Sequence, residues 1–157
     1  MKDSLKQDFQ RRLSQCNKGE MIVIMYDIVF AYLDEAKEAY TVDNYDEYKA
    51  AIKNGQKSIE SLINALDFSY DISKELHPLY VTCRNLLAKA IYQNRLDGIE
   101  EAEKILKRLY SSFCEAAKSD TSGPLMRNTQ AVYAGMTYGK SSLNENLTGD
   151  YNRGFLA

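Results

Sequence analysis

The sequence predicts an all-α protein whose main part is an antiparallel, up-down-up-down four-helix bundle. Four segments of similar length repeat apolar residues at steps of three and four, and no segment alternates as a strand would. The connections between these segments are only a few residues long, so neighbouring helices are expected to run in opposite directions. We expect a short amphipathic N-terminal segment over 1–16, the bundle over 17–119, and a partly irregular C-terminal tail over 120–157.

The N-terminal segment carries Leu5, Phe9 and Leu13, spaced four residues apart among charged neighbours. This spacing places the three apolar side chains on one face of a helix. A helix this short is marginally stable in water on its own, so we expect it to cover an apolar surface of the bundle. The run 132–139 in the tail, which contains two tyrosines, is a second candidate cover.

The first bundle helix is predicted from Asn17 to about Tyr40, because Asn17 and Glu20 form a capping-box pattern. Residues 21–33 are apolar or aromatic at every position except Asp27. At about 100° per residue, such a run covers more of the helix circumference than packing against one core requires. It is shorter than the roughly 20 apolar residues that cross a membrane. The helix is therefore either buried on most sides or has a second apolar face for a partner.

The second bundle helix is predicted to open at the capping-box pattern of Asn44 and Glu47 and to continue to Leu66. Gly55 stands where the apolar stripe of this helix expects a side chain. Since glycine costs about 1 kcal/mol of helix propensity, we expect Gly55 to allow the close approach of a neighbouring helix.

The third bundle helix is predicted to start near Asp71 or Ser73. Proline is tolerated only in the first turn of a helix, so Pro78 requires either a later start, near Leu76, or a bend. The fourth bundle helix is predicted to open with residues 97–100, a third capping-box pattern.

The composition argues against catalysis and against binding of nucleic acid or membranes. The net charge is −2 with acids and bases interspersed, which leaves no basic footprint for either partner. His77 is the single histidine, so neither a di-metal site nor a catalytic triad can be built. Cys16, Cys83 and Cys114 form no CxxC pattern and suit reduced thiols. No secretory signal is read, and we predict a cytoplasmic protein without cofactor, metal or enzymatic activity.

With these classes of function excluded, the apolar surface of the first bundle helix is the feature most able to bind a partner. We hypothesise that a groove beside the first bundle helix accepts an amphipathic helix of another chain. The candidate partner-binding residues are Ile22, Met25, Tyr26, Val29, Phe30 and Leu33, and the candidate self-capping residues are Leu5, Phe9 and Leu13. The alternative is a structural helical adaptor, or a homo-oligomer whose apolar face meets another copy of itself.

The motifs along these helices resemble the FliS family of flagellar export chaperones. In that family a Met-Leu-Tyr-Asp-Gly pattern begins the first long helix, where this chain has Met25-Tyr26-Asp27-Ile28 after an apolar run. Residues 64–67 (Asn-Ala-Leu-Asp) are similar to the family's Ser-Leu-Asp end of the second helix. Residues 76–80 (Leu-His-Pro-Leu-Tyr) are similar to its Leu-x-x-Leu-Tyr start of the third. The resemblance covers about residues 15 to 118, and Ile28 stands where the family usually has glycine.

The resemblance implies a cytoplasmic chaperone that binds the C-terminal segment of flagellin as helices in apolar surface grooves. Such binding would keep flagellin from polymerising too early and would deliver it to the flagellar type III export apparatus. It also implies that the N-terminal segment occupies part of this surface and is displaced by flagellin. An export-gate component or a co-chaperone would be a second partner, and neither a nucleic acid nor a membrane is expected as one.

Overall fold

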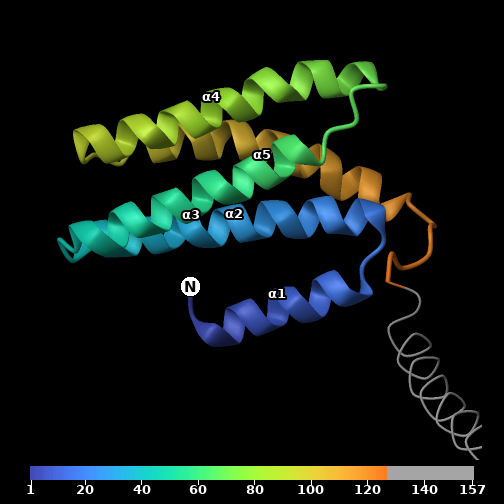
Figure 1. Ribbon diagram of the computed structural model, residues 1–157, viewed down its shortest axis with the longest axis horizontal. Helices are drawn as coiled ribbons and strands as arrows, with labels where there is room; N and C mark the ends of the chain where they lie inside the picture. The colour runs from blue at the N-terminus through green and yellow to red at the C-terminus, as the bar shows by residue number, and fades with distance from the viewer. Residues whose placement is uncertain (127–157) are drawn as a thin grey trace, which may run out of the picture. The chain divides into compact units, whose positions relative to one another are not determined.

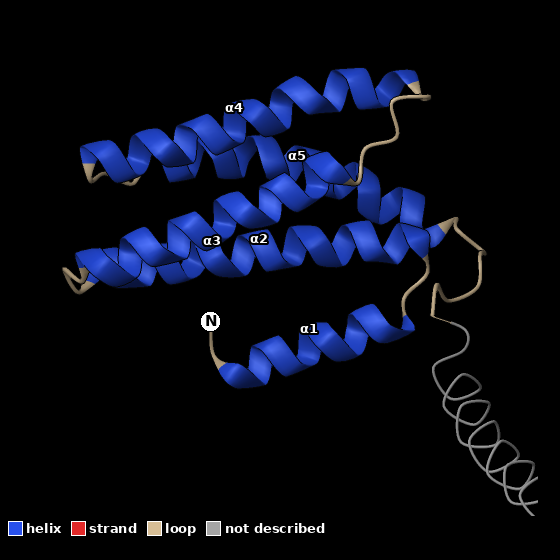
Figure 2. Cartoon of the chain, in the orientation of Figure 1, coloured by secondary structure: helices blue, strands red, loops and turns tan. Residues whose placement is uncertain are grey.

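The computed structural model describes residues 1–126, which form helices joined by short connections. The helices are α1 (Asp3–Gln15), α2 (Lys18–Thr41), α3 (Tyr45–Asn64), α4 (Asp71–Gln93) and α5 (Asp97–Lys118), as Figures 1 and 2 show. No strand occurs in this part of the chain, so the all-α prediction is confirmed for it. Most of the predicted tail, including the run 132–139, lies outside the described residues.

Each of the four long helices contacts two of the others. Helix α2 contacts α3 and α5, and α4 contacts the same two helices. Helix α1 lies beside α2 (Figure 1), and among the described helices it makes its contacts with α2 alone. The short helix is therefore attached to one face of one helix, outside the ring of contacts that α2 to α5 form.

The predicted starts of α2 and α5 are both confirmed, but the capping box predicted at α5 is wrong. The Asn17 side chain accepts from the Glu20 backbone N–H at 2.8 Å, and Glu20 accepts from the Asn17 N–H at 2.9 Å, which completes a capping box. At α5 the N-cap is Leu96, with no side-chain cap. Asp97 is the first helical residue and caps no backbone N–H, so its charge favours α5 through the helix dipole. It also pairs with Arg95 at 2.6 Å.

The other two helix starts follow from their local sequences. At α3 the Asn44 side chain accepts from the Glu47 N–H at 3.3 Å and donates to the Glu47 carboxylate at 2.8 Å. Helix α4 begins at Asp71 and includes Pro78 in its interior. The alternative of a later start near Leu76 is therefore wrong.

Helix α2 contributes to two separate apolar clusters, which confirms that its apolar circumference exceeds what one core needs. Tyr26, Val29 and Leu33 enter the main cluster, which is shared with α3, α4 and α5. The second apolar face of α2, made of Met21, Ile24, Ile28 and Ala31, packs instead with side chains from α1 and the α1–α2 connection. The cluster on that face has its own buried residues, Phe9, Cys16 and Ile24.

The close helix approach expected at Gly55 occurs at Gly98. A methyl group on Gly55 would lie 3.5 Å from its nearest neighbour, a Leu33 methyl, which is an ordinary contact. A methyl group on Gly98 would overlap the Leu86 carbonyl oxygen of α4. Gly98 therefore allows α5 to start against the α4 backbone, while Gly55 leaves room for a small side chain.

The described residues contain neither a metal-binding cluster nor a membrane-spanning helix. Within 1–126, no cluster of three or more histidine, cysteine, aspartate or glutamate side chains is arranged to hold a metal ion. None of the described helices combines the length and the apolar character that crossing a membrane requires.

Candidate functional site: a groove along α2 between α1 and α5

Three of the six predicted partner-binding residues are not at the surface. Tyr26, Val29 and Leu33 are each 0% exposed, and the Tyr26 hydroxyl makes a 2.7 Å hydrogen bond with the Tyr80 hydroxyl inside the main cluster. Their assignment to the surface is therefore wrong, because this stripe of α2 faces the other long helices. A charge at Val29 would test the stability of the core rather than the binding of a partner.

The other three predicted residues lie at the margin of the core. Ile22, Met25 and Phe30 are half-buried and pack against the main cluster from its edge. Phe30 meets Tyr110 of α5 edge-on, with ring centroids 5.4 Å apart and planes at 90°. These side chains are firmly placed, and part of each is open to solvent.

The predicted self-capping residues differ in how they meet α2. Phe9 is buried in the second cluster with 6% of its surface exposed, and Leu13 packs against that cluster. Leu5 is 38% exposed and lies outside it. The contact between α1 and α2 thus depends mainly on the C-terminal half of α1.

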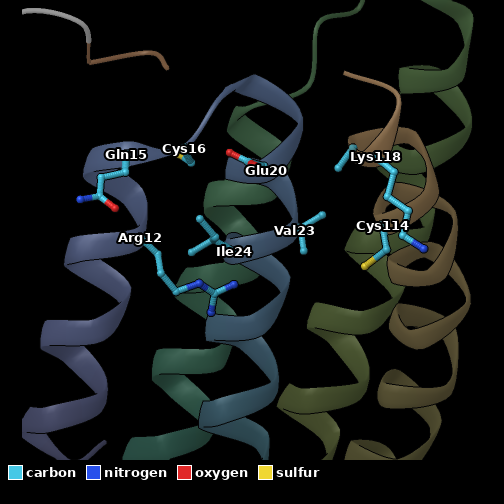
Figure 3. Close-up of a pocket in the computed structure, with 9 residues that line it drawn as sticks. Arg12, Gln15, Cys16, Glu20, Val23, Ile24, Cys114 and Lys118 are labelled. Carbon is cyan, nitrogen blue, oxygen red and sulfur yellow. The ribbon is translucent and has the colours of Figure 1, made fainter. Parts of the chain in front are cut away.

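A groove of about 590 Å³ lies where the end of α1, the start of α2 and the end of α5 meet. Figure 3 shows α1 on one side of it, α5 on the other, and α2 between them. Val23 of α2 points toward α5 and belongs to neither apolar cluster. The groove is lined by Arg12, Gln15, Cys16, Glu20, Val23, Ile24, Cys114, Ala117 and Lys118.

None of these nine residues was among the predicted binding positions. Val23 and Ile24 belong to the apolar run 21–33, and that run was the available signal for them. The side chains of α5 reach the groove only through tertiary packing, so no local pattern marks them.

Asp27, the one charged residue of the apolar run, joins three helices. Its carboxylate accepts from the Arg12 guanidinium of α1 at 2.6 Å and from the Tyr110 hydroxyl of α5 at 2.8 Å. The hydrogen bond to Asp27, followed by burial, raises the pKa of the Tyr110 phenol, so this hydroxyl stays a neutral donor. The two contacts occupy both oxygens of a side chain that is 22% exposed.

A second groove, of about 460 Å³, adjoins the N-terminal half of α1. Leu5 and Phe9 line it from α1, and Asp27, Phe30 and Ala31 line it from α2. Its wall also includes Met1 and Lys2, which precede α1, and four further acids, Asp34, Glu35, Glu38 and Glu47. Because Arg12 lines the first groove and Asp27 the second, their ion pair lies where the two grooves approach each other.

The segment after α5 fixes the start of α2 beside the first groove. The Asp120 carboxylate accepts from the Gly19 N–H at 2.9 Å, and the Leu125 N–H donates to the Cys16 carbonyl at 3.0 Å. Hydrogen bonds from Ser122, together with that from Gly19, lower the pKa of Asp120 and keep it charged at the positive end of α2. The α1–α2 connection is thereby held even where α1 itself has few contacts.

Comparison with known families gives a match that covers most of the chain. Residues 1–120 match the family described as "Flagellar protein FliS". A comparison with curated proteins found no match. The matched region spans all five helices and both grooves. The chain belongs to the FliS family of flagellar export chaperones.

Proposed function

We propose that this chain is a cytoplasmic export chaperone that binds the C-terminal helical segment of flagellin along α2. Binding there would prevent premature polymerisation of flagellin and bring it to the flagellar type III export apparatus. A chaperone role in flagellar assembly follows from the family. The flagellin segment, its site and its delivery are our proposal. We also infer that α2 to α5 form an antiparallel up-down-up-down bundle, with α2 used from two sides.

The observation that supports this proposal is the second apolar face of α2 and its small cover. One helix of 13 residues covers that face, and among the described helices it contacts α2 only. A helix of this length is marginal in water, so its helical state depends on the contact it makes. An amphipathic helix from another chain could replace it and bury the same face without disturbing the main cluster.

The binding surface that we propose combines the face of α2 that α1 covers (Met21, Ile24, Ile28 and Ala31) with the margin residues and the groove. Ile22, Met25 and Phe30 retain their predicted role, Val23 is added, and Tyr26, Val29 and Leu33 become the buried support beneath them. Phe9 and Leu13 remain the proposed self-cover. The mechanism is the exchange of one helix contact for another and involves no covalent step.

This exchange also accounts for release of the bound segment. A segment that folds as it binds buries about 1,000–3,000 Å², and the entropy lost on its ordering offsets part of the interaction energy. Undocking of α1 lowers the net gain further, because the surface of α2 is already covered in the free chaperone. The complex is then tight enough to protect flagellin and weak enough to release it.

Isothermal titration of the flagellin C-terminal segment into the chain tests the proposal. Val23→Glu places a charge on the floor of the groove and should weaken binding by about 2 kcal/mol, the scale of a hot spot. Tyr92→Glu is the matched control, since Tyr92 is 91% exposed at the end of α4 and should leave binding unchanged.

Absence of binding to the unmodified chain would refute the proposal. Light scattering on the same samples separates the alternative, because a stable dimer that ignores flagellin indicates a helical adaptor or homo-oligomer.

A further inference from the structure

The position of Asp27 restricts which helices can replace α1. Asp27 is the only charged position within 21–33 and is largely buried at the edge of two apolar clusters. Its partners come from different helices, Arg12 from α1 and Tyr110 from α5. In Figure 3 the Arg12 side chain extends from α1 toward α2.

Only one of these partners remains when α1 leaves. Tyr110 belongs to α5, which packs against α2 through the main cluster and stays in place. Arg12 leaves with α1, and the carboxylate then has a neutral hydroxyl as its remaining partner among the contacts described above. Removing one member of a partly buried ion pair is costly because the other charge stays desolvated without compensation. A covering helix that brings no cation would bear this cost.

We infer that Asp27 is a specificity-determining residue, which favours flagellin segments that carry a lysine or arginine where α1 carries Arg12. This inference rests on the proposed function, because it concerns the helix that takes the place of α1. The pattern read from α1 is an apolar anchor at Phe9, a cation at Arg12, and a second anchor at Leu13. The guanidinium of Arg12 also lies 5.7 Å from the centroid of the Phe9 ring, so anchor and cation form one recognition unit.

The surroundings of Asp27 favour a cation in the same place. Asp34, Glu35, Glu38 and Glu47 line the adjoining groove. The cations among its lining residues are Lys2 and the Met1 ammonium, which pairs with Glu35, and both precede α1 and leave with it. A helix carrying basic residues would therefore meet an attractive field along the N-terminal half of the α1 site. An acidic helix of equal apolar character would be disfavoured along the same surface.

The test must separate two effects of changing Asp27. Asp27→Asn removes the partner of a client cation, but it also loosens α1, which by itself would tighten client binding. Arg12→Gln loosens α1 and leaves the Asp27 carboxylate in place, so it provides the background for the comparison. In that background the amide side chain introduced by Asp27→Asn still offers an oxygen to Tyr110, which preserves the contact with α5.

Titrations of the flagellin C-terminal segment encoded in the same genome give the readout. The segment should bind the Arg12→Gln variant more tightly than it binds the unmodified chain. Adding Asp27→Asn should weaken binding at least tenfold, whereas adding Asp71→Asn, which removes the same charge from an exposed position of α4 outside both grooves, should change it less than twofold. Changing one lysine or arginine of the segment to glutamine should lower its affinity for the Arg12→Gln variant about tenfold. The same change should leave its affinity for the Arg12→Gln/Asp27→Asn double variant unaltered.

Three outcomes overturn the inference while flagellin binding itself persists. These are equal losses of affinity with Asp27→Asn and Asp71→Asn, a small loss in both, or the absence of any cation in the segment that couples to Asp27. Should Asp27→Asn fail to fold, the cation scan against Arg12→Gln still decides, since insensitivity at every lysine and arginine contradicts the inference. Failure of the segment to bind the unmodified chain would instead refute the proposed function, and this inference with it.

Discussion

Replacing Phe9 with alanine tests whether α1 is a removable cover. Phe9 is the most buried apolar side chain of α1, with 6% of its surface exposed, and it belongs to the second cluster rather than the main one. Full burial of a phenylalanine contributes about 1.5–3 kcal/mol, so the change should weaken docking of α1 by about 2 kcal/mol. Because α1 can detach instead of leaving a cavity, we take the transfer value and omit the cavity cost.

This loss of docking should appear as a gain in flagellin binding. While α1 is docked, the affinity for the flagellin segment is reduced by the fraction of chains in which α2 is uncovered. A loss of about 2 kcal/mol in docking corresponds to a roughly 30-fold increase in the uncovered to covered ratio. The dissociation constant should therefore fall by up to about 30-fold, with smaller gains if α1 is already undocked part of the time.

Isothermal titration at constant salt, with Leu5→Ala as the control, makes the measurement. Leu5 is on the same helix but is 38% exposed and outside the second cluster, so its removal should change the dissociation constant less than threefold. Circular dichroism should show α2 to α5 intact in both variants. Unchanged or weaker flagellin binding by Phe9→Ala, in a chain that remains folded, would show that α1 does not compete for the surface of α2.

Three further predictions concern stability. Gly98→Ala should destabilise the fold by about 2 kcal/mol because the methyl group overlaps the α4 backbone, whereas Gly55→Ala should stabilise it by about 0.5–1 kcal/mol; equal effects in chemical denaturation would refute this contrast. Asn17→Ala should cost about 1–2 kcal/mol, and Asn17→Ser should recover most of it if capping is the cause. Burial raises the pKa of Glu103, but hydrogen bonds from Lys107 and Lys37 outweigh it and lower that pKa. This contribution to stability is therefore complete above the unfolded value of about 4.5 and is lost as pH falls through the folded value. Glu103→Gln should flatten the decline of Tm in that range, and an unaltered acid profile would count against it.

The sequence predicts the helices well because their patterns are local. Asn17 with Glu20, and Asn44 with Glu47, mark helix starts that the structure contains. The pattern at 97–100 has aspartate in place of asparagine, a residue that also caps helices, yet Asp97 is already the first helical residue rather than the cap before it. A capping pattern indicates that a side chain can reach a backbone N–H. Which residue becomes the first of the helix depends also on the path of the connection from α4.

The proposed binding face of α2 could not be assigned from the sequence for a related reason. An apolar run that covers the whole circumference carries no periodic contrast, so it predicts two faces without saying which one meets the main core. Tyr26, Val29 and Leu33 were predicted at the surface although they are buried, and Met21 and Ile24 belong to the face that α1 covers. Only the packing of α3, α4 and α5 distinguishes these stripes.

The separation of the two apolar clusters is what makes an exchangeable cover physically reasonable. If Phe9 and Leu13 were part of the main cluster, their departure would open the core and the free chaperone would unfold with every exchange. Because they pack on a separate face, the cost of their departure is limited to that face and to two ion pairs, Arg12 with Asp27 and the Met1 ammonium with Glu35. The apolar part of this cost is offset by any amphipathic helix, whereas the ionic part is offset only by a helix with a cation in the right place. Asp27 therefore provides discrimination at a surface whose apolar contacts alone would accept many sequences.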